Sequence, residues 1–185
     1  ANSAGSSPTD SLFVYDVTSN SWSSDHTLPV AMHGASAVAK EGLIYVGGSY
    51  QQPGPFYSVN PASWTWDDLA DMASGEHFQP MAEINGSLYL VGQFGDLRVY
   101  DIATNVWDDS GQNVPSEYSD GIGSPQGATD GDYFYIVRGD GTTMSLLMYN
   151  PATNSWKILK HLAEYRYKGS MVYLNGWLYY IAGQT

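Results

Sequence analysis

The sequence predicts an all-β protein built from four repeats of a four-stranded unit. Three observations predict this class: a segment that returns at a nearly constant spacing, short apolar runs separated by glycine-containing turns, and a high aromatic content. The 185 residues include 20 Gly, 9 Pro, 15 Tyr and 6 Trp. A chain of this length corresponds to one domain, which buries enough surface to fold without disulfides.

Four octets that align without gaps define the repeat. Each has an Asp or Asn followed six residues later by a Trp, and the Asp or Asn positions are 44, 41 and 49 residues apart. The Asp or Asn side chain can bond to the backbone and open a turn, and the Trp anchors the next strand. Each octet therefore predicts a hairpin, at 15–22, 59–66, 100–107 and 149–156.

A second hairpin lies between successive octets, and its second strand is a near-continuous apolar run. Markers in these runs, spaced by 45, 46 and 45 residues, are Val46, Val91, Val137 and Ala182. The turns that precede the runs contain Glu41-Gly42, Asn85-Gly86, Asp130-Gly131 and Asn175-Gly176. Asn-Gly and Asp-Gly are strong hairpin signals, and continuous apolar strands indicate burial on both faces.

Together these features resemble four kelch-type repeats of a β-propeller, from about Leu12 to Gln184. Only the first repeat keeps the full Gly47-Gly48 pair that is typical of the family. The resemblance implies four-stranded antiparallel blades around an axis, with partners bound by the loops. We expect a flexible tail or linker at 1–10, and complete blades at about 33–70, 77–110 and 123–160.

The phase of the repeat predicts how the ring closes. The octet comes first, so strands at 12–27 form an outer pair and strands at 169–183 form an inner pair. We expect the two pairs to make one composite blade that closes a four-bladed ring and removes exposed edges. Two alternatives stay open: a larger ring or polymer completed by strands of a neighbouring chain, and a piece of a longer propeller.

Charge and cysteine content exclude several classes of function. The net charge of −12 argues against nucleic acid or an anionic membrane surface as partner, and no apolar run is long enough to span a membrane. The chain has no Cys, which excludes a disulfide scaffold, thiolate catalysis and cysteine-bound zinc. The absence of Cys also excludes the Cys–Tyr crosslink of copper-radical galactose oxidases, the best-known class of enzymes with kelch repeats. We expect no cofactor.

Loops that join repeated strands are the expected site of function, because the strands serve as scaffold. Their sequences diverge between repeats, which predicts one asymmetric binding site. The candidate contact residues are His33, Tyr50, Glu76, His77, Phe94, Tyr118, Asp120, Arg138, Arg166 and Tyr167. We expect no metal at His33, Glu76 and His77, because no HxH or HExxH spacing is present. No Gly-x-Ser-x-Gly motif or distinguished carboxylate pair supports catalysis, so we expect no enzyme and no catalytic residue.

The sequence therefore predicts a non-catalytic binding or assembly module that meets a protein or glycan at its loops. The alternatives are a lectin-like carbohydrate-binding protein and a structural subunit that polymerises by exchange of terminal strands. We expect an extracellular or secreted setting from the acidic charge, the missing initiator Met, the small polar N-terminal tract and the sequon Asn85-Gly86-Ser87. The sequon makes Asn85 a candidate for glycosylation.

Overall fold

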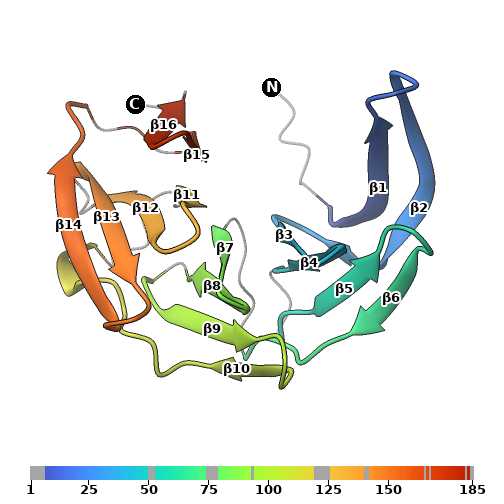
Figure 1. Cartoon of the computed structure of the whole chain (residues 1–185), viewed down its shortest axis with the longest axis horizontal. Coiled ribbons are helices and arrows are strands. Elements are labelled where there is room, and N and C mark those ends of the chain that lie inside the picture. Colours follow the sequence, from blue (N-terminus) through green and yellow to red (C-terminus); the bar gives the residue numbers. More distant parts are fainter. Residues whose placement is uncertain are drawn as a thin grey trace.

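The computed structural model describes residues 7–49, 53–73, 79–92, 94–118, 126–139, 142–164, 166, 168–181 and 183. Three antiparallel sheets of four strands and two antiparallel hairpins make up the fold. Figure 1 shows them following one another around an open arc. The N-terminal hairpin consists of β1 (Thr9–Asp16) and β2 (Ser21–Met32). The C-terminal hairpin consists of β15 (Ser170–Leu174) and β16 (Trp177–Ile181).

The three complete blades have their strands in simple sequence order. Blade 1 comprises β3 (Ser36–Lys40), β4 (Leu43–Gly47), β5 (Phe56–Asn60) and β6 (Thr65–Asp68). Blade 2 comprises β7 (Met81–Ile84), β8 (Ser87–Val91), β9 (Leu97–Asp101) and β10 (Val106–Asp108). Blade 3 comprises β11 (Gln126–Thr129), β12 (Phe134–Gly139), β13 (Met144–Asn150) and β14 (Ser155–His161). A three-residue 3₁₀ turn, η1 (Ser116–Tyr118), lies in the link between blades 2 and 3.

The first strands of successive blades meet at the inside of the arc. Strand β7 contacts both β3 and β11, and β11 also contacts β15. This arrangement confirms the predicted all-β fold with four-stranded antiparallel propeller blades (Figure 1). Among the described residues, no helix has the length and hydropathy that a membrane span requires.

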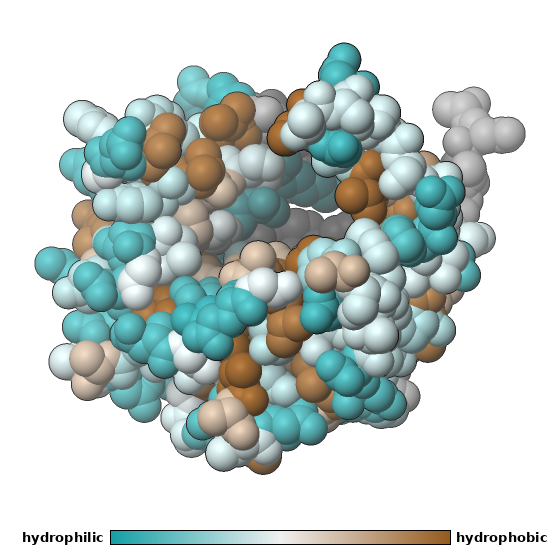
Figure 2. All heavy atoms as spheres, turned by 45° about the vertical axis from the view of Figure 1, so that its right-hand side comes forward, coloured by the Kyte–Doolittle hydropathy of each residue, from teal (hydrophilic) through white to brown (hydrophobic). Residues whose placement is uncertain are grey.

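The composite blade that the sequence predicted is not formed. The N-terminal and C-terminal hairpins are two separate two-stranded sheets, and Figure 1 shows them on opposite sides of the opening in the arc. Strand β1 also begins at Thr9, inside the segment predicted as a tail, because Thr9 pairs with Met32 across two register shifts. Many apolar side chains of both hairpins are therefore exposed. The space-filling view in Figure 2 shows the hollow that the arc encloses, with apolar side chains along its border.

The octets form the outer hairpin turns for the physical reason that the sequence suggested. The carboxylate or amide oxygen of the first turn residue accepts a backbone N–H bond in every repeat. Asn20, Asn105 and Asn154 then take positive φ angles of 53°, 56° and 47°. Asn tolerates this left-handed conformation better than most residues. In the second repeat Trp64 occupies that position, and its ring stacks on His26 with 3.7 Å between centroids.

Two apolar clusters fill the spaces between blades. Phe56, Leu88 and Tyr100 belong to the cluster between blades 1 and 2, with Trp107 packed against them. A larger cluster joins blades 2 and 3 and the link between them, and it includes Ile84, Val91, Leu97, Tyr118, Phe134, Ile136, Leu147 and Tyr149. Successive blades are therefore held by interdigitating faces, as the near-continuous apolar strands predicted.

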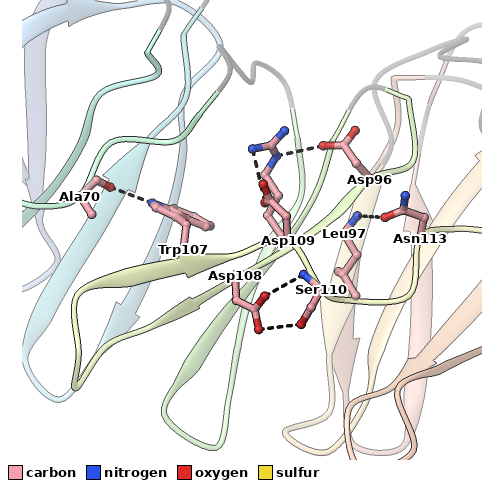
Figure 3. Close-up of polar contacts among 9 residues, drawn as sticks. Ala70, Asp96, Leu97, Trp107, Asp108, Asp109, Ser110 and Asn113 are labelled. Atoms are coloured by element: carbon pink, nitrogen blue, oxygen red, sulfur yellow. Dashed lines mark hydrogen bonds and ion pairs between the residues drawn. The ribbon is translucent and has the colours of Figure 1, made fainter.

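A polar contact that occurs twice, which we call the clasp, joins the outer hairpins of blades 2 and 3 to the links that precede these blades. The Ala70 N–H donates to Asn105 Oδ1 at 2.8 Å. Trp107 Nε1 donates to the Ala70 carbonyl at 2.8 Å, as Figure 3 shows. Asn154 and Trp156 hold the N–H and carbonyl of Gln112 in the same way. The Asn and Trp of the octet thus bind both backbone groups of one residue in the neighbouring blade's link.

An ion pair joins blades 1 and 2 on the side of the inner hairpin turns. Lys40 Nζ lies 2.9 Å from Glu83 Oε1, which also accepts the Gly86 N–H at 2.8 Å. Burial opposes ionisation of Glu83, but the bonds from Lys40 and Gly86 outweigh it and hold the carboxyl pKa below its ordinary value. A lowered folded-state pKa gives stability that is present above the unfolded pKa, about 4.3, and is lost as the pH falls through the folded value.

We expect Glu83→Gln to lower the thermal midpoint at pH 7 and to leave it unchanged at pH 3. The two proteins should converge as the pH falls through the lowered pKa of Glu83, because the wild-type carboxyl then becomes neutral as well. Thermal melts at pH 7, 5, 4 and 3 measure this. Glu41→Gln is the control, because the Glu41 side chain is largely exposed. A difference that persists at pH 3 would contradict the ionic origin.

Candidate partner-binding surface

The strand order places two classes of loop on one side of the arc. In an antiparallel blade, the turn between the second and third strands lies at the same end as the link to the next blade. We call this side the loop face. Its described turn residues are 48–49, 53–55, 92, 94–96 and 142–143, and its described link residues are 33–35, 69–73, 79–80, 109–118, 162–164, 166 and 168–169. The inner and outer hairpin turns lie on the opposite side. Asn85, which is exposed with φ 51°, therefore lies away from the loop face.

Five of the ten predicted contact residues are described by the structure, and all five lie in or beside loop-face segments. They are His33, Phe94, Tyr118, Arg138 and Arg166. The other five lie outside the described residues: Tyr50, Glu76, His77, Asp120 and Tyr167. Any metal site that needs Glu76 and His77 is therefore untested. Within the described ranges, no group of three His, Asp or Glu side chains has the arrangement of a metal site.

Phe94 is the most exposed aromatic candidate on the loop face, with 69% of its surface accessible. It lies in a tight turn in which the Gly92 N–H bonds to the Asp96 carbonyl at 2.7 Å and the Gly95 N–H bonds to the Gly92 carbonyl at 3.0 Å. Gly95 takes a positive φ of 85°, a left-handed backbone conformation that favours glycine. The turn therefore presents an apolar ring to solvent from a fixed backbone.

The Arg98 guanidinium connects this turn to the link that follows blade 2. Arg98 Nε lies 2.9 Å from Asp96 Oδ2, and Arg98 Nη1 lies 3.5 Å from Asp109 Oδ1. Asn113 Oδ1 accepts the Leu97 N–H at 3.1 Å, as Figure 3 shows. The sequence analysis missed Arg98 and Asn113 because neither belongs to a motif. The one signal for Arg98 is a basic residue within a strand of a chain that has only 7 Lys and Arg.

Arg138 and Tyr118 are buried, whereas the sequence analysis listed both as candidates for contact with a partner. Arg138 is only 2% exposed, its Nε donates to the Tyr118 carbonyl, and its Nη1 donates to the Gly92 carbonyl at 3.2 Å. Tyr118 is buried in η1, where its hydroxyl accepts a bond from Ser145 Oγ at 3.4 Å. Arg138 thus connects Tyr118 to the Phe94 turn from the interior of the protein. Because both side chains are buried, neither is exposed to a partner.

Arg166 and His33 mark the two far parts of the loop face. Arg166 is partly exposed and binds the Glu164 carboxylate through Nε at 3.1 Å. Its carbonyl accepts the Tyr180 hydroxyl at 3.0 Å, which ties the last link to β16. His33 is half-buried just after β2. The structure therefore does not bring Arg166, His33 and Phe94 into one small pocket, and their arrangement suits a broad contact surface.

Comparison with curated proteins gives several kelch-type relatives. The chain is 30% identical over 110 residues to Kelch-like protein 40 of Xenopus laevis, covering 54% of this chain and 18% of that protein. It is 23% identical over 188 residues to Kelch-like protein 23 of Pongo abelii, covering 94% of this chain and 32% of that protein. It is also 28% identical over 126 residues to N-acetylneuraminate epimerase of Haemophilus influenzae, covering 63% and 34%.

The chain thus spans between about a fifth and a third of the length of these relatives. No family profile matches it. The four-stranded blades, the repeated octets and the sequence similarity nevertheless agree with one another, as the resemblance predicted. The relatives and the four-stranded blades together support a kelch-repeat β-propeller.

Proposed function

We propose that this chain is a non-catalytic protein-binding module whose contact surface is the loop face around Phe94. The observation that carries the proposal is a 69% exposed phenylalanine held on a hydrogen-bonded turn with Gly95 at a positive φ. Exposed aromatic side chains are enriched in the centres of protein interfaces, and function concentrates on loops that a rigid scaffold positions. The similarity to several Kelch-like proteins supports a propeller that acts by binding.

Charge around Phe94 suggests the chemistry of the partner. Asp96 and Asp109 share the single cation of Arg98, and Glu117 is exposed nearby in η1. The whole chain carries a net charge of −12. A partner with an apolar pocket bordered by Lys or Arg would complement this surface, and its association rate would fall with ionic strength.

Phe94→Ser tests the contact surface. We expect at least a tenfold loss of affinity for a partner isolated with the wild-type chain from the native extract and then purified, because interface aromatics often contribute more than 1.4 kcal/mol. Titration calorimetry measures the change. The matched control is Val17→Ser, which removes an apolar side chain that is exposed on the opposite side of the arc. Equal affinity of Phe94→Ser and wild type would contradict the assignment.

The setting and the ligand class are further parts of the proposal. We propose an extracellular setting because the composition is acidic. We also propose that Asn85 is glycosylated, because its sequon lies in an exposed turn. A glycosidase-sensitive mass shift that Asn85→Gln abolishes would support both. Glycan binding, as in a lectin, is the alternative at the same face, and strong signals on a glycan array would favour it over a protein partner.

A catalytic alternative rests on the similarity to N-acetylneuraminate epimerase. The similarity covers 34% of the epimerase, so it supports a shared repeat more directly than a shared activity. Turnover of N-acetylneuraminate by this chain, followed by NMR, would favour catalysis over binding.

A further inference from the structure

Two of the nine asparagines precede a glycine, and both of these pairs form inner hairpin turns. Asn85-Gly86 joins β7 to β8, and Asn175-Gly176 joins β15 to β16. Their backbones are nearly the same, with φ angles of 51° and 86° in the first turn and of 50° and 84° in the second. Both asparagines are exposed. The molecule therefore presents one two-residue turn twice, in two different side-chain surroundings.

An Asn-Gly pair can undergo a reaction with its own backbone. The Gly nitrogen attacks the Asn Cγ, a new N–Cγ bond forms, and the side-chain nitrogen leaves as ammonia with the proton of the attacking N–H. Water then opens the five-membered succinimide ring at either carbonyl. The product is aspartate, or isoaspartate, in which the main chain runs through the former side-chain carbonyl. Glycine hinders the attack least, because it has no Cβ. The rate therefore depends on how the Gly N–H is held.

In blade 2 a carboxylate holds the attacking nitrogen. The Gly86 N–H donates to Glu83 Oε1 at 2.8 Å, and Lys40 Nζ lies 2.9 Å from the same oxygen. Although burial opposes ionisation of Glu83, these bonds hold its pKa below the ordinary value, so the carboxylate is charged at neutral pH. Attack would break the hydrogen bond and place the charge of a deprotonated amide beside the carboxylate. Both effects slow the reaction at Asn85.

In the C-terminal hairpin, Tyr173 occupies the position of Glu83. Glu83 pairs with Leu88 and Tyr173 pairs with Leu178, and each of the two lies two residues before the asparagine of its turn. A phenol in place of the carboxylate brings no charge to the turn. Within the described part of the chain, no side chain or backbone group accepts the Gly176 N–H. The attacking nitrogen of the second turn is therefore exposed to water and unrestrained.

The other two inner turns are protected in different ways. Blade 3 has Asp130-Gly131, where the Gly131 N–H donates to Thr129 Oγ1 at 2.9 Å and the carboxylate accepts three further hydrogen bonds. Blade 1 has Glu41, whose longer side chain cannot form the five-membered ring. Of the four inner turns, the one at Asn175 combines an asparagine with a Gly N–H that no described residue holds.

The exposure of Asn175 follows from its place in the repeat and not from the ends of the chain. Blade 2 has a complete blade on each side, and its equivalent residue Asn85 is nevertheless exposed. Glu41 in the turn of blade 1 is exposed as well. A strand added beside β16 would extend the sheet outward and leave this turn accessible.

We propose that Asn175 is a site of spontaneous deamidation and isoaspartate formation, and that Glu83 protects Asn85 from the same reaction. Opening of the ring at the main-chain carbonyl inserts a Cβ into the backbone and leaves a new carboxylate beside it. A two-residue turn has no room in its geometry for that extra atom, so the pairing of Leu174 with Trp177 is lost. The hairpin that contacts β11 of blade 3 then loosens as the protein ages.

Peptide mapping of stored protein compares the two sites. The protein is made in bacteria, so that no glycan blocks Asn85, and is kept folded in mildly alkaline buffer for several weeks. We expect Asn175 to react at least about tenfold faster than Asn85, the factor that a hydrogen bond to a charged group supplies. Methyl transfer by protein isoaspartate methyltransferase identifies the isoaspartyl product. Equal rates at the two sites, faster reaction at Asn85, or an unchanged Asn175 would overturn the proposal.

Unfolding in guanidinium chloride is the first control, because both turns then lose their surroundings. The two asparagines should react at similar rates in the unfolded chain. A rate difference that persists in denaturant would come from the adjoining sequence and would overturn the protective role of Glu83.

Exchange of the residue two positions before the asparagine is the second test. Tyr173→Glu places a carboxylate where Glu83 stands in blade 2, and should slow the reaction at Asn175 about tenfold. The matched control is Tyr173→Leu, which removes the phenol without adding charge and should keep the wild-type rate. Glu83→Ala should accelerate the reaction at Asn85 by a similar factor, and the Tyr173 pair decides the matter if that variant does not fold. Equal rates at Asn175 in Tyr173→Glu and Tyr173→Leu would show that a carboxylate at this position gives no protection.

Discussion

Trp107→Ala should lower the free energy of unfolding by about 3 kcal/mol, the lower end of the range for loss of a large packed aromatic, because Trp107 is only partly buried. The Trp107 ring lies 5.0 Å from Phe56 and 5.1 Å from Tyr100, and its Nε1 bonds to the Ala70 carbonyl. Truncation therefore leaves a cavity between blades 1 and 2 and an unsatisfied carbonyl in their link. Urea unfolding followed by circular dichroism measures the loss.

Trp22→Ala is the matched control for this experiment. Trp22 has the same place in its octet as Trp107, but it is 68% exposed, and no carbonyl of the described residues accepts a bond from its indole. Trp22→Ala should cost less than about 1 kcal/mol, as expected for an exposed side chain. Equal losses for the two variants would mean that the octet Trp acts within its own hairpin and does not join blades.

Arg138→Met should cost about 3 kcal/mol, because the variant removes the charged hydrogen bonds of a buried guanidinium to two carbonyls, and the Gly92 carbonyl then keeps only the Gly95 N–H. The Arg138 guanidinium binds the carbonyls of Tyr118 and Gly92, and so connects blade 3 to the Phe94 turn of blade 2. Methionine keeps the length of the side chain and removes its five donors. Urea unfolding gives the stability, and hydrogen exchange at 92–96 shows whether the turn loosens.

Arg166→Met provides the comparison for Arg138. The Arg166 guanidinium is partly exposed and pairs with Glu164, which is itself exposed. Surface ion pairs of this kind contribute little, so the loss should stay below about 1 kcal/mol. If Arg138→Met were as mild as Arg166→Met, the buried arginine would not be holding the two blades together.

The architecture could be predicted from the sequence because it depends on local chemistry. Asp or Asn turn residues and Asn-Gly or Asp-Gly dipeptides act within a few residues, and the structure places a hairpin at each of them. Register was harder. The apolar runs align Val46 with Val91. In the structure Val46 pairs with Tyr57, and the residue equivalent to Tyr57 in blade 2 is Arg98, which pairs with Leu90. The true counterpart of Val46 is therefore Leu90, one residue before Val91. Hydrophobicity alone does not distinguish neighbouring positions when both faces of a strand are buried.

Contacts between blades could not be predicted from the repeat. Asn105 belongs to a recognised octet, but its bond to Ala70 crosses to another blade and has no local signature. The burial of Arg138 was missed for the same reason, since an arginine beside a loop is usually exposed. The composite blade was predicted from strand order, and the structure shows that order alone does not bring β1 and β16 together.

The central functional claim is that the loop face around Phe94 contacts a protein partner. Photo-crosslinking tests it most directly, with a benzophenone amino acid placed at position 94 and, in a separate protein, at position 17 on the opposite side of the arc. The loop-face account predicts a covalent adduct with one partner from position 94 and none from position 17. Adducts from position 17 alone, or equally from both positions, would contradict it.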